Sequence, residues 1–256
     1  MLKNLIAHPL TRGLDLNDPL TTSRRRQIIS EKKFLKEIYA EWYRLIAADL
    51  PDGSDPVLEI GAGAGFMGDY IPSLVASEVF HCPNIDVVCD ATSLPLDDGS
   101  LRAIVMTDVL HHIPNVESFF AEAARCVRPG GVIVMIEPWL TPWSKLIYSY
   151  LHHEPFEPAV QDWGFPSRGA LSSANGALPW IVFHRDRTRF GRMFPQWEIQ
   201  EIKLLMPFTY LLSGGVSLRS LMPGWAFRFW RQMENLLPQA SFAMFARVVL
   251  KRGNEI

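Results

Sequence analysis

The stretch "VLEIGAGAGF", residues 57–66, constrains the fold more than any other part of the sequence. An apolar run of this kind is typical of a buried β-strand. The alternating glycines Gly61, Gly63 and Gly65 let the backbone turn tightly and approach a ligand closely. A strand that leads into a glycine-rich turn is typical of α/β proteins, which bind ligands at the carboxyl ends of their strands. The stretch therefore predicts an α/β fold with a ligand site beside this turn.

Strand-like and helical patterns alternate along much of the remaining sequence. Residues 1–23 are expected to be irregular. A helix is predicted over residues 24–50, because apolar residues recur there at three- and four-residue spacing before Pro51 and Gly53. A second amphipathic helix is predicted over residues 116–127. Strands are predicted at residues 56–60, 73–78, 86–91, 101–108, 131–138, 197–206 and 242–252.

This alternation predicts a doubly wound, mostly parallel seven-stranded sheet, in which the last two strands form an antiparallel edge. "RPGG", residues 128–131, is predicted to be a turn before the fifth strand. The segment 207–240, rich in Phe and Trp, is expected to be partly helical.

Length and composition favour one α/β domain and exclude several functional classes. The 256 residues are 48% apolar, enough for a sizeable core, and the net charge of −2 gives no general attraction to nucleic acid. The three cysteines are far apart and form no metal-ligand pattern, which favours a reducing, cytoplasmic environment. We see neither a signal peptide nor an apolar run long enough to span a membrane.

The glycine turn alone leaves several ligands open. A phosphate-binding P-loop is excluded, because no Gly-Lys-Ser/Thr follows the turn. Gly63, Gly65 and Gly68 match the dinucleotide fingerprint Gly-x-Gly-x-x-Gly, which leaves an NAD(P)-dependent oxidoreductase possible. Glycines that serve only a tight turn are a further alternative.

Two acidic residues that end predicted strands favour a ligand with an adenosine group. Glu78 stands thirteen positions after Gly65, where a carboxylate can accept hydrogen bonds from both ribose hydroxyls. Asp90 ends the third predicted strand. Its carboxylate can accept from the exocyclic amine of an adenine while the backbone N–H of Ala91 donates to a ring nitrogen.

Together these motifs resemble a known family. "VLEIGAGAG", an acid after the second strand, "DATSLPLDDGS", "DVLHHIP" and "RCVRPGG" follow in the order typical of class I S-adenosylmethionine-dependent methyltransferases. The similarity is greatest to the small-molecule branch that includes the ubiquinone and menaquinone methyltransferases. It implies a Rossmann-like methyltransferase fold with an N-terminal helix and an inserted aromatic-rich cap. It also implies S-adenosyl-L-methionine as cofactor, and thus a methyltransferase enzyme.

The resemblance implies a single domain, residues 1–256, in three parts. Residues 1–53 form a helical lead-in, residues 54–138 the cofactor-binding core, and residues 139–256 the acceptor-side elements and edge strands. The sequence departs from the family at "VFHCPNI", residues 79–85, because members usually carry a full helix there. The adenosine side of the pocket must therefore be rebuilt or more open.

Cofactor contacts are expected around the glycine turn and the fourth strand. Gly61, Ala62, Gly63 and Gly65 would supply close backbone for the methionine portion. Glu59 would hold the ligand's ammonium group, directly or through water. The resemblance implies that Thr107 and Asp108, at the end of the fourth strand, contact the same portion of the cofactor.

Methyl transfer is largely a matter of alignment, and a base is needed only if the acceptor must lose a proton. His111 and His112 follow the fourth strand and are the candidate bases, although residues at these positions also pack and cap. His152, His153 and Glu154 are predicted to belong to the acceptor pocket. We expect no metal there, because adjacent side chains point apart and no third ligand is evident.

Tyr39 and Tyr43 lie four residues apart, so both phenols share one face of the N-terminal helix. In enzymes that this chain resembles, such a helix covers the cofactor, so Tyr43 is a candidate contact. Packing against the sheet is the alternative for both side chains.

The last third of the sequence combines aromatic side chains with arginine and lysine. Much of this region must be core, and the remainder is suited to an apolar acceptor tunnel or an anionic membrane surface. We therefore expect a small hydrophobic or lipid-linked acceptor, no nucleic acid partner, and a cytoplasmic protein with peripheral membrane contact. Alternatives are a regulatory protein that binds S-adenosylmethionine without catalysis, and the oxidoreductase named above.

Overall fold

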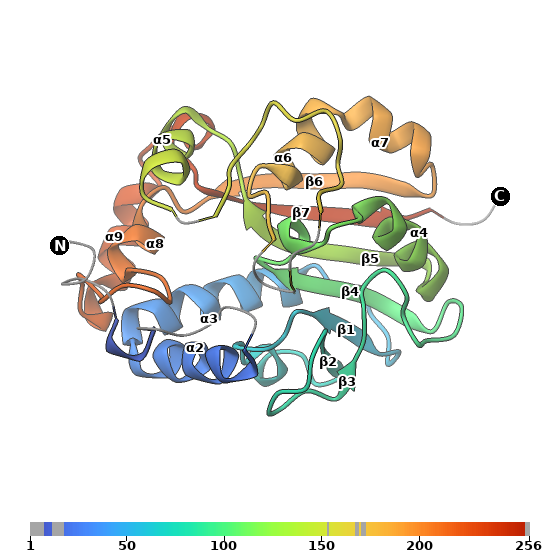
Figure 1. Cartoon of the computed structure of the whole chain (residues 1–256), viewed down its shortest axis with the longest axis horizontal. Coiled ribbons are helices and arrows are strands. Elements are labelled where there is room, and N and C mark those ends of the chain that lie inside the picture. The colour runs from blue at the N-terminus through green and yellow to red at the C-terminus, as the bar shows by residue number, and fades with distance from the viewer. Residues whose placement is uncertain (1–7, 12–17, 153, 167–168, 170–172, 254–256) are drawn as a thin grey trace.

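A seven-stranded sheet forms the centre of the computed structural model, which describes residues 8–11, 18–152, 154–166, 169 and 173–253 (Figure 1). The strand order is β3-β2-β1-β4-β5-β7-β6, and all neighbours are parallel except β7, which is antiparallel to both β5 and β6. The predicted doubly wound, mostly parallel sheet with an antiparallel edge is confirmed. The strands are β1 (Val57–Ile60), β2 (Leu74–Glu78), β3 (Val87–Val88), β4 (Leu101–Thr107), β5 (Val127–Pro138), β6 (Trp197–Leu205) and β7 (Phe245–Arg252).

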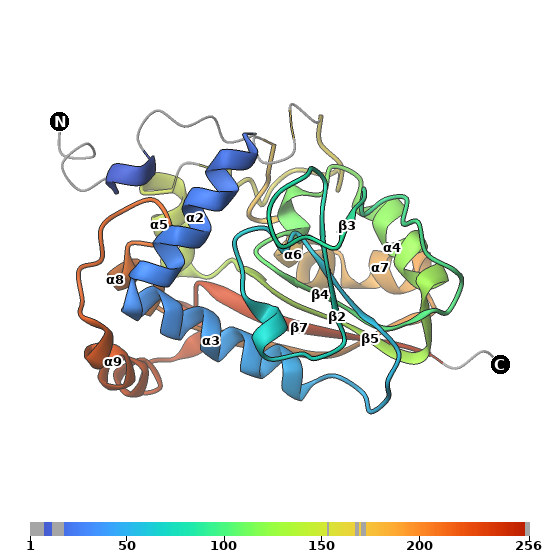
Figure 2. The same ribbon diagram turned by 90° about the horizontal axis from the view of Figure 1, so that it is seen from below.

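Helices cover both faces of this sheet, as Figures 1 and 2 show. The helical segments are η1 (Pro9–Thr11), α2 (Pro19–Glu31), α3 (Lys33–Ala48), η2 (Met67–Asp69), η3 (Leu110–His112), α4 (Val116–Cys126), α5 (Pro142–Tyr150), α6 (Leu178–Trp180), the π-helical turn η4 (Ile181–Arg185), α7 (Arg187–Met193), α8 (Thr209–Ser213), η5 (Gly224–Ala226), α9 (Phe227–Glu234) and α10 (Gln239–Phe242).

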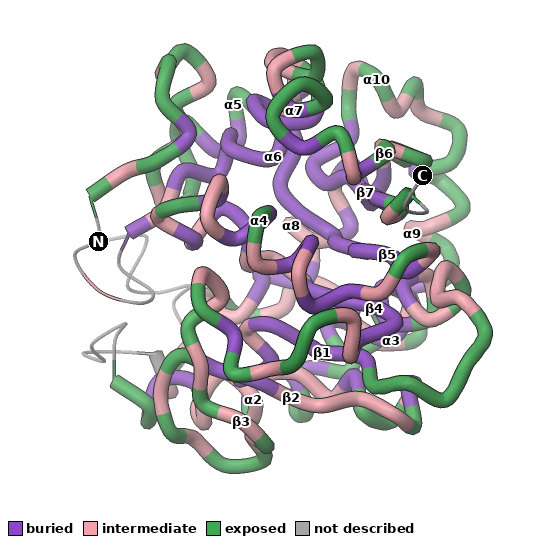
Figure 3. The backbone as a smooth tube through the Cα atoms, turned by 90° about the vertical axis from the view of Figure 1, so that its right-hand side faces the viewer, coloured by how far each residue is buried: buried purple, intermediate pink, exposed green. Residues whose placement is uncertain are grey.

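Alternate side chains of the central strands enter two separate cores. On one face Ile104 of β4 packs in a cluster with Phe119 and Phe120 of α4 and with residues of α6 and α7. On the other face Val105 packs in a cluster with Trp42 of α3. Figure 3 shows the buried backbone that results, with β1, β4, β5 and β7 in purple at the centre. Both faces are covered, which is why the strands are nearly continuous apolar runs.

The predicted helix over residues 24–50 is two helices, α2 and α3. The first begins earlier than expected, at Pro19, because the Asp18 side chain accepts a hydrogen bond from the N–H of Leu20 and Pro19 suits the first turn. Lys32 separates the helices with φ −84° and ψ 87°. Its buried ammonium donates to the carbonyl oxygens of Gly215 and Leu218, so a distant loop determines where the chain bends.

The "RPGG" stretch, predicted to be a turn, lies within β5. The pairing of β4 with β5 shifts its register between Leu101 and Ala103, which marks a bulge. A Cβ on Gly131 would lie 2.7 Å from the carbonyl oxygen of Arg102. Glycine therefore lets β5 pass close to its neighbour and continue as a strand.

Three of the helices that follow β5 gather at the carboxyl ends of the parallel strands. In Figure 1 the helices α5, α8 and α9 lie together at this end, with α2 and α3 below them. Residues 79–86, between β2 and β3, form bends and a turn rather than a helix. None of the helices in the described ranges is long and apolar enough to cross a membrane.

Candidate active site

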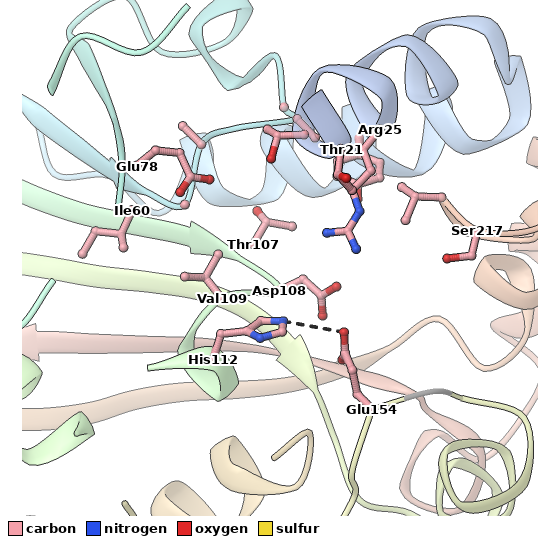
Figure 4. A pocket seen from close by; sticks show the side chains of 18 of the residues that line it. Thr21, Arg25, Ile60, Glu78, Thr107, Asp108, Val109, His112, Glu154 and Ser217 are labelled. Atoms are coloured by element: carbon pink, nitrogen blue, oxygen red, sulfur yellow. Dashed lines mark ion pairs between the residues drawn. The ribbon is translucent and has the colours of Figure 1, made fainter. Parts of the chain in front are cut away.

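One large cavity, of about 1090 Å³, lies at the carboxyl ends of the parallel strands. Its lining comes from the glycine turn after β1, the ends of β2, β3 and β4, helices α2, α3 and α5, and the loop that follows α8. A concave site at this edge of an open α/β sheet is where such folds bind ligands. The cavity therefore marks the candidate site, part of which Figure 4 shows.

The glycine turn needs glycine at its first three positions. Gly61 has a φ of +70°, and a Cβ there would lie 2.6 Å from Val109. A Cβ on Gly63 would lie 2.6 Å from the carboxylate of Glu78, and one on Gly65 would lie 2.5 Å from the hydroxyl of Tyr43. Gly61, Ala62 and Gly65 line the cavity, whereas Gly63 packs behind its wall.

The third glycine of the dinucleotide fingerprint has no such role. A Cβ on Gly68 would meet nothing within 4 Å. In dinucleotide-binding folds this glycine allows close packing of helix on strand. The spacing that suggested a dinucleotide is therefore not matched by the packing.

Glu78 ends β2 and lines the cavity as predicted. Its Oε1 accepts the N–H of Gly63 at 3.3 Å, and its Oε2 accepts the N–H of Val79 at 3.0 Å. The side chain is thus fixed beside the glycine turn. Burial nevertheless raises its pKa.

Asp90 and Ala91 follow β3 and also line the cavity. The Oδ1 of Asp90 accepts from the N–H and the hydroxyl of Thr92, at 2.8 and 2.7 Å. These bonds orient an exposed carboxylate at the end of the cavity formed by β2 and β3. With no helix between those strands, this end of the site is open, as the sequence suggested.

Glu59 lies at the bottom of the cavity, 5% exposed, near the end of β1. Burial, together with the neighbouring charge of Glu78, raises its pKa to about 8. A cation placed beside Glu59 would favour its ionised form. The site therefore offers a buried acid to a positively charged group.

Thr107 and Asp108 end β4, and both line the cavity. The Thr107 hydroxyl oxygen is buried and has no hydrogen-bond partner among the described residues. Asp108 has a φ of 63°, the left-handed conformation that non-glycine residues rarely adopt. Strained backbone of this kind is concentrated at functional sites. An unpaired hydroxyl beside it points to a polar ligand.

Tyr39 and Tyr43 of α3 share one face of the helix, with ring centroids 5.9 Å apart. Both line the cavity, and Tyr43 also packs edge-on against Phe66 at 5.0 Å. Contact with the cofactor and packing against the sheet were alternative predictions for these residues. The structure is compatible with both, because the rings pack within the core and also face the cavity. The sequence did not single out Thr21, Thr22 or Arg25 of α2, which also line the cavity.

The two candidate bases have different environments. His111 is fully buried and does not line the cavity, whereas His112 does. Burial lowers the pKa of His112 to about 4, so its ring is neutral near pH 7. Its Nδ1 lies 3.0 Å from the carbonyl oxygen of Ser173 and must donate to it. The Nε2 of His112 therefore carries the lone pair.

Glu137, a residue that the sequence did not single out, supports this region from the end of β5. Its Oε1 accepts the N–H groups of Val109 and Leu110 at 2.8 and 2.7 Å, and its Oε2 lies 2.8 Å from the Nδ1 of His111. Burial opposes a charge on His111, but Glu137 and Glu154 outweigh it and raise the His111 pKa. A glutamate ending an otherwise apolar strand was the only signal available in the sequence.

Two of the three predicted acceptor-pocket residues lie in the cavity. Glu154 and His152 line the cavity, and Glu154 faces both His111 and His112 at 3.4 and 3.7 Å. Figure 4 shows Glu154 and His112 meeting below Asp108. His153 lies outside the described residues.

Comparison with known proteins agrees with this geometry. Residues 58–135 match a family model described as a methyltransferase domain. The chain carries a class I S-adenosylmethionine-dependent methyltransferase domain.

Relatives of this methyltransferase domain include enzymes named for quinone biosynthesis. The ubiquinone/menaquinone biosynthesis C-methyltransferase UbiE of Desulfotalea psychrophila is 27% identical over 155 residues, which are 53% of this chain and 60% of that protein. The demethylmenaquinone methyltransferase of Beutenbergia cavernae is 27% identical over 140 residues, 42% of this chain and 58% of that protein. The chain thus spans about three fifths of these relatives.

Solved structures share the fold of this chain over nearly its full length. Geranyl diphosphate C-methyltransferase from Streptomyces coelicolor, in complex with Mg²⁺, geranyl diphosphate and S-adenosyl-L-homocysteine, has a TM-score of 0.54 and 16% identity, covering 96% of this chain and 91% of that one. A complex of the Haloferax volcanii Trm112 methyltransferase activator and a putative methyltransferase has a TM-score of 0.55 and 12% identity, covering 94% and 99%.

The residues of the cavity fit S-adenosylmethionine. Backbone at Gly61 and Gly65 lines the cavity, Glu78 and Asp90 offer acceptors for a ribose and an adenine, and the buried acid Glu59 suits an ammonium group. The unpaired hydroxyl of Thr107 lies in the same cavity. Nothing in this set resembles a phosphate cradle.

Proposed function

We propose that this protein transfers a methyl group from S-adenosyl-L-methionine to a small hydrophobic or lipid-linked acceptor. The observation that carries the proposal is a continuous cavity, which joins the glycine turn and its carboxylates to an apolar second half. That half is lined by aliphatic and aromatic side chains, among them Ile147, Tyr148, Leu151, Tyr210, Leu211, Leu218, Leu221 and Met244.

Five parts of the chain would hold the cofactor. Glu78 would accept from the ribose hydroxyls, Asp90 and Ala91 would bind the adenine edge, and Glu59 would face the ammonium group. Gly61, Ala62 and Gly65 would pass close to the methionine portion, with Gly63 packed behind them. Thr107, Asp108 and Tyr43 would complete this part of the pocket.

When bound, S-adenosylmethionine supplies an electrophilic methyl group on a sulfonium centre. The chain's own contribution is to hold an acceptor in line and to exclude water, which can account for most of the acceleration of such a step. Of the two candidate bases, His112 faces the cavity with a free lone pair, whereas His111 lies behind Glu154. His112 would accept a proton from an acceptor that must lose one.

The rim of the cavity supports an apolar acceptor. Leu151 and Leu221 are each 65% exposed and line the cavity, so apolar surface continues from the interior to the outside. Further exposed apolar side chains follow Leu221 in the sequence: Trp225 on η5, Phe229 on α9 and Leu236 after it. Exposed Arg219 and Arg228 lie in the same segment and suit anionic headgroups. We propose that this surface rests on a membrane that presents the acceptor.

Calorimetric titration with S-adenosylhomocysteine, NADH and NADPH tests the cofactor. We expect binding of S-adenosylhomocysteine alone, weakened by about tenfold in Asp90→Ala, since a hydrogen bond to a charged group contributes about 1.5–3 kcal/mol. Binding of a nicotinamide nucleotide instead would reassign the glycine turn to a dehydrogenase.

A second assay separates catalysis from mere binding. Tritiated methyl groups from S-adenosylmethionine should enter the organic extract of membrane lipids or quinone precursors incubated with the protein. Binding of the cofactor without transfer to any acceptor class would favour the regulatory alternative.

A further inference from the structure

Three side chains converge at the acceptor end of the cavity. One ring nitrogen of His111, one of His112 and a carboxylate oxygen of Glu154 all lie within 4.8 Å of one another. His111 Nε2 is 3.4 Å from Glu154 Oε2, and His112 Nε2 is 3.7 Å from Glu154 Oε1. Ligands held ~2.0–2.2 Å from one metal ion lie ~3–3.5 Å apart, so small side-chain movements would complete a coordination sphere.

Hydrogen bonds on the far side of each ring orient both Nε2 atoms toward this point. Glu137 already accepts two backbone N–H groups, so it is a carboxylate that receives the Nδ1–H of His111 at 2.8 Å. The carbonyl oxygen of Ser173 has no proton to give, so the Nδ1 of His112 donates to it. Histidine ligands of protein-bound metals are held in this way, with the other ring N–H given to a carboxylate or a carbonyl.

The contacts that join the two rings to Glu154 are long, at 3.4 and 3.7 Å. His111 is fully buried, and its Nε2 makes no hydrogen bond of adequate geometry within the described part of the chain. The lone pair of His112 Nε2 faces an oxygen of Glu154, so two acceptors confront each other at 3.7 Å. A cation between the three groups would replace these long contacts with short ones.

We propose that His111, His112 and Glu154 bind a divalent transition-metal ion through two imidazole nitrogens and one carboxylate. Imidazole ligands suit Zn²⁺, Fe²⁺, Co²⁺ and Ni²⁺, whereas an all-oxygen set would suit Mg²⁺ or Ca²⁺. Asp108 Oδ1 lies 4.0 Å from His111 Nε2, at the edge of this ligand set. The sequence led us to expect no metal, because it drew attention to His152 and His153 rather than to this pair.

The site adds to the proposed methyl transfer and does not depend on it. Because His112, Glu154 and Asp108 line the cavity, an ion here would keep open positions toward the acceptor. Resting on the proposed function, such an ion would bind an acceptor oxygen and favour its deprotonated form. It would then replace His112 as the group that activates the acceptor.

Cobalt titration tests the site without any reference to activity. Chelator-treated, desalted wild-type protein is titrated with CoCl₂ under anaerobic conditions and followed by visible absorption, with ZnCl₂ calorimetry in parallel. We expect ligand-field bands that saturate at one equivalent, without the thiolate charge-transfer band that Cys82 or Cys89 would give. His112→Ala and Glu154→Gln should each weaken binding by at least about tenfold.

His81→Ala provides the matched control, because His81 is exposed and lies beside Cys82. It should titrate like wild type. Circular dichroism and thermal unfolding confirm that each variant is folded, and His111→Ala is avoided because its ring is fully buried. No saturable Co²⁺ binding, or binding that His112→Ala and Glu154→Gln leave unchanged, would overturn the proposal. Cofactor titration of the same wild-type sample separates this failure from a failure of the methyltransferase assignment.

Discussion

At the scale of single residues, the site depends on contacts between segments far apart in the sequence. Gly63 is an example, because the space that its missing side chain leaves is taken by Glu78 and by Thr22. The same carboxylate accepts the N–H of Gly63, so glycine and glutamate fix each other.

Gly63→Ala should weaken S-adenosylhomocysteine binding by about tenfold or more. The new Cβ, 2.6 Å from Glu78 Oε1, would displace the carboxylate that is proposed to hold the ribose, and a lost bond of this kind contributes about 1.5–3 kcal/mol. Gly68→Ala is the matched control, because its Cβ meets nothing, and its affinity should stay within about twofold. Calorimetry measures both. Equal affinities of the two variants would contradict the arrangement.

Cofactor binding should also depend on the protonation of Glu59. Its pKa of about 8 means that the free protein carries mostly the neutral acid at pH 7, whereas an ammonium partner requires the carboxylate. The affinity should therefore rise with pH up to about 8 and then level off, and binding at pH 7 should release a proton.

Calorimetry of S-adenosylhomocysteine at pH 7 in phosphate and in Tris measures that proton release. The observed enthalpies should differ in wild type and agree more closely in Glu59→Gln, which has no proton to lose. Identical wild-type enthalpies in the two buffers would rule out the role of Glu59.

Residues next to a recognisable pattern could be predicted from the sequence, and residues that act across the fold could not. Gly61, Glu78 and Asp90 line the cavity as expected. Glu137 and Arg25 were missed, because their importance arises only when β5 meets η3 and α2 folds over the cavity. His111 was predicted beside His112, yet its ring turns into the core to meet Glu137.

At the scale of elements, apolar periodicity predicted which segments are helices and strands but not where they end. The boundary between α2 and α3 is determined by Lys32, whose partners lie more than 180 residues away. The "RPGG" stretch has the composition of a turn, and only the neighbouring backbone of Arg102 shows why it continues as β5. Both causes are long-range contacts, which a local sequence pattern cannot predict.

Lys32→Met should destabilise the fold by about 1–3 kcal/mol, because the carbonyl oxygens of Gly215 and Leu218 lose their buried donor. Urea denaturation followed by circular dichroism measures the free energy of unfolding. Lys33→Met, at the adjacent exposed position, should change it by less than about 0.5 kcal/mol. If the two variants unfold alike, the bend does not depend on the Lys32 ammonium.

At the scale of the whole molecule, the order of the motifs predicted the sheet, because each strand of a parallel sheet must be followed by a crossover that returns the chain. The sheet then brings four strand ends and the later helices around one cavity. The individual helices that cover the acceptor half could not be predicted, since residues 139–240 have weak periodicity and pack by long-range contacts.

The exposed apolar surface of η5 and α9 should bind anionic vesicles. Trp225 is 84% exposed and Phe229 is 56% exposed, and their joint replacement by alanine should reduce co-flotation with phosphatidylglycerol liposomes several-fold. Two control variants, Val88→Ala on the edge strand β3 and Gly68→Ala, should float like wild type. Flotation that is absent in wild type, with transfer to a water-soluble acceptor intact, would argue against a lipid-linked substrate.

The missing helix between β2 and β3 has a practical consequence. Asp90 is exposed and only bends and a turn stand beside it, so the adenine edge of a bound ligand would face the solvent. A cofactor analogue tethered to a resin through a linker on its adenine should therefore retain this protein, while relatives with a complete helix at that place would exclude the linker. The open edge thus offers a chemical handle for selective capture from a mixture of similar enzymes.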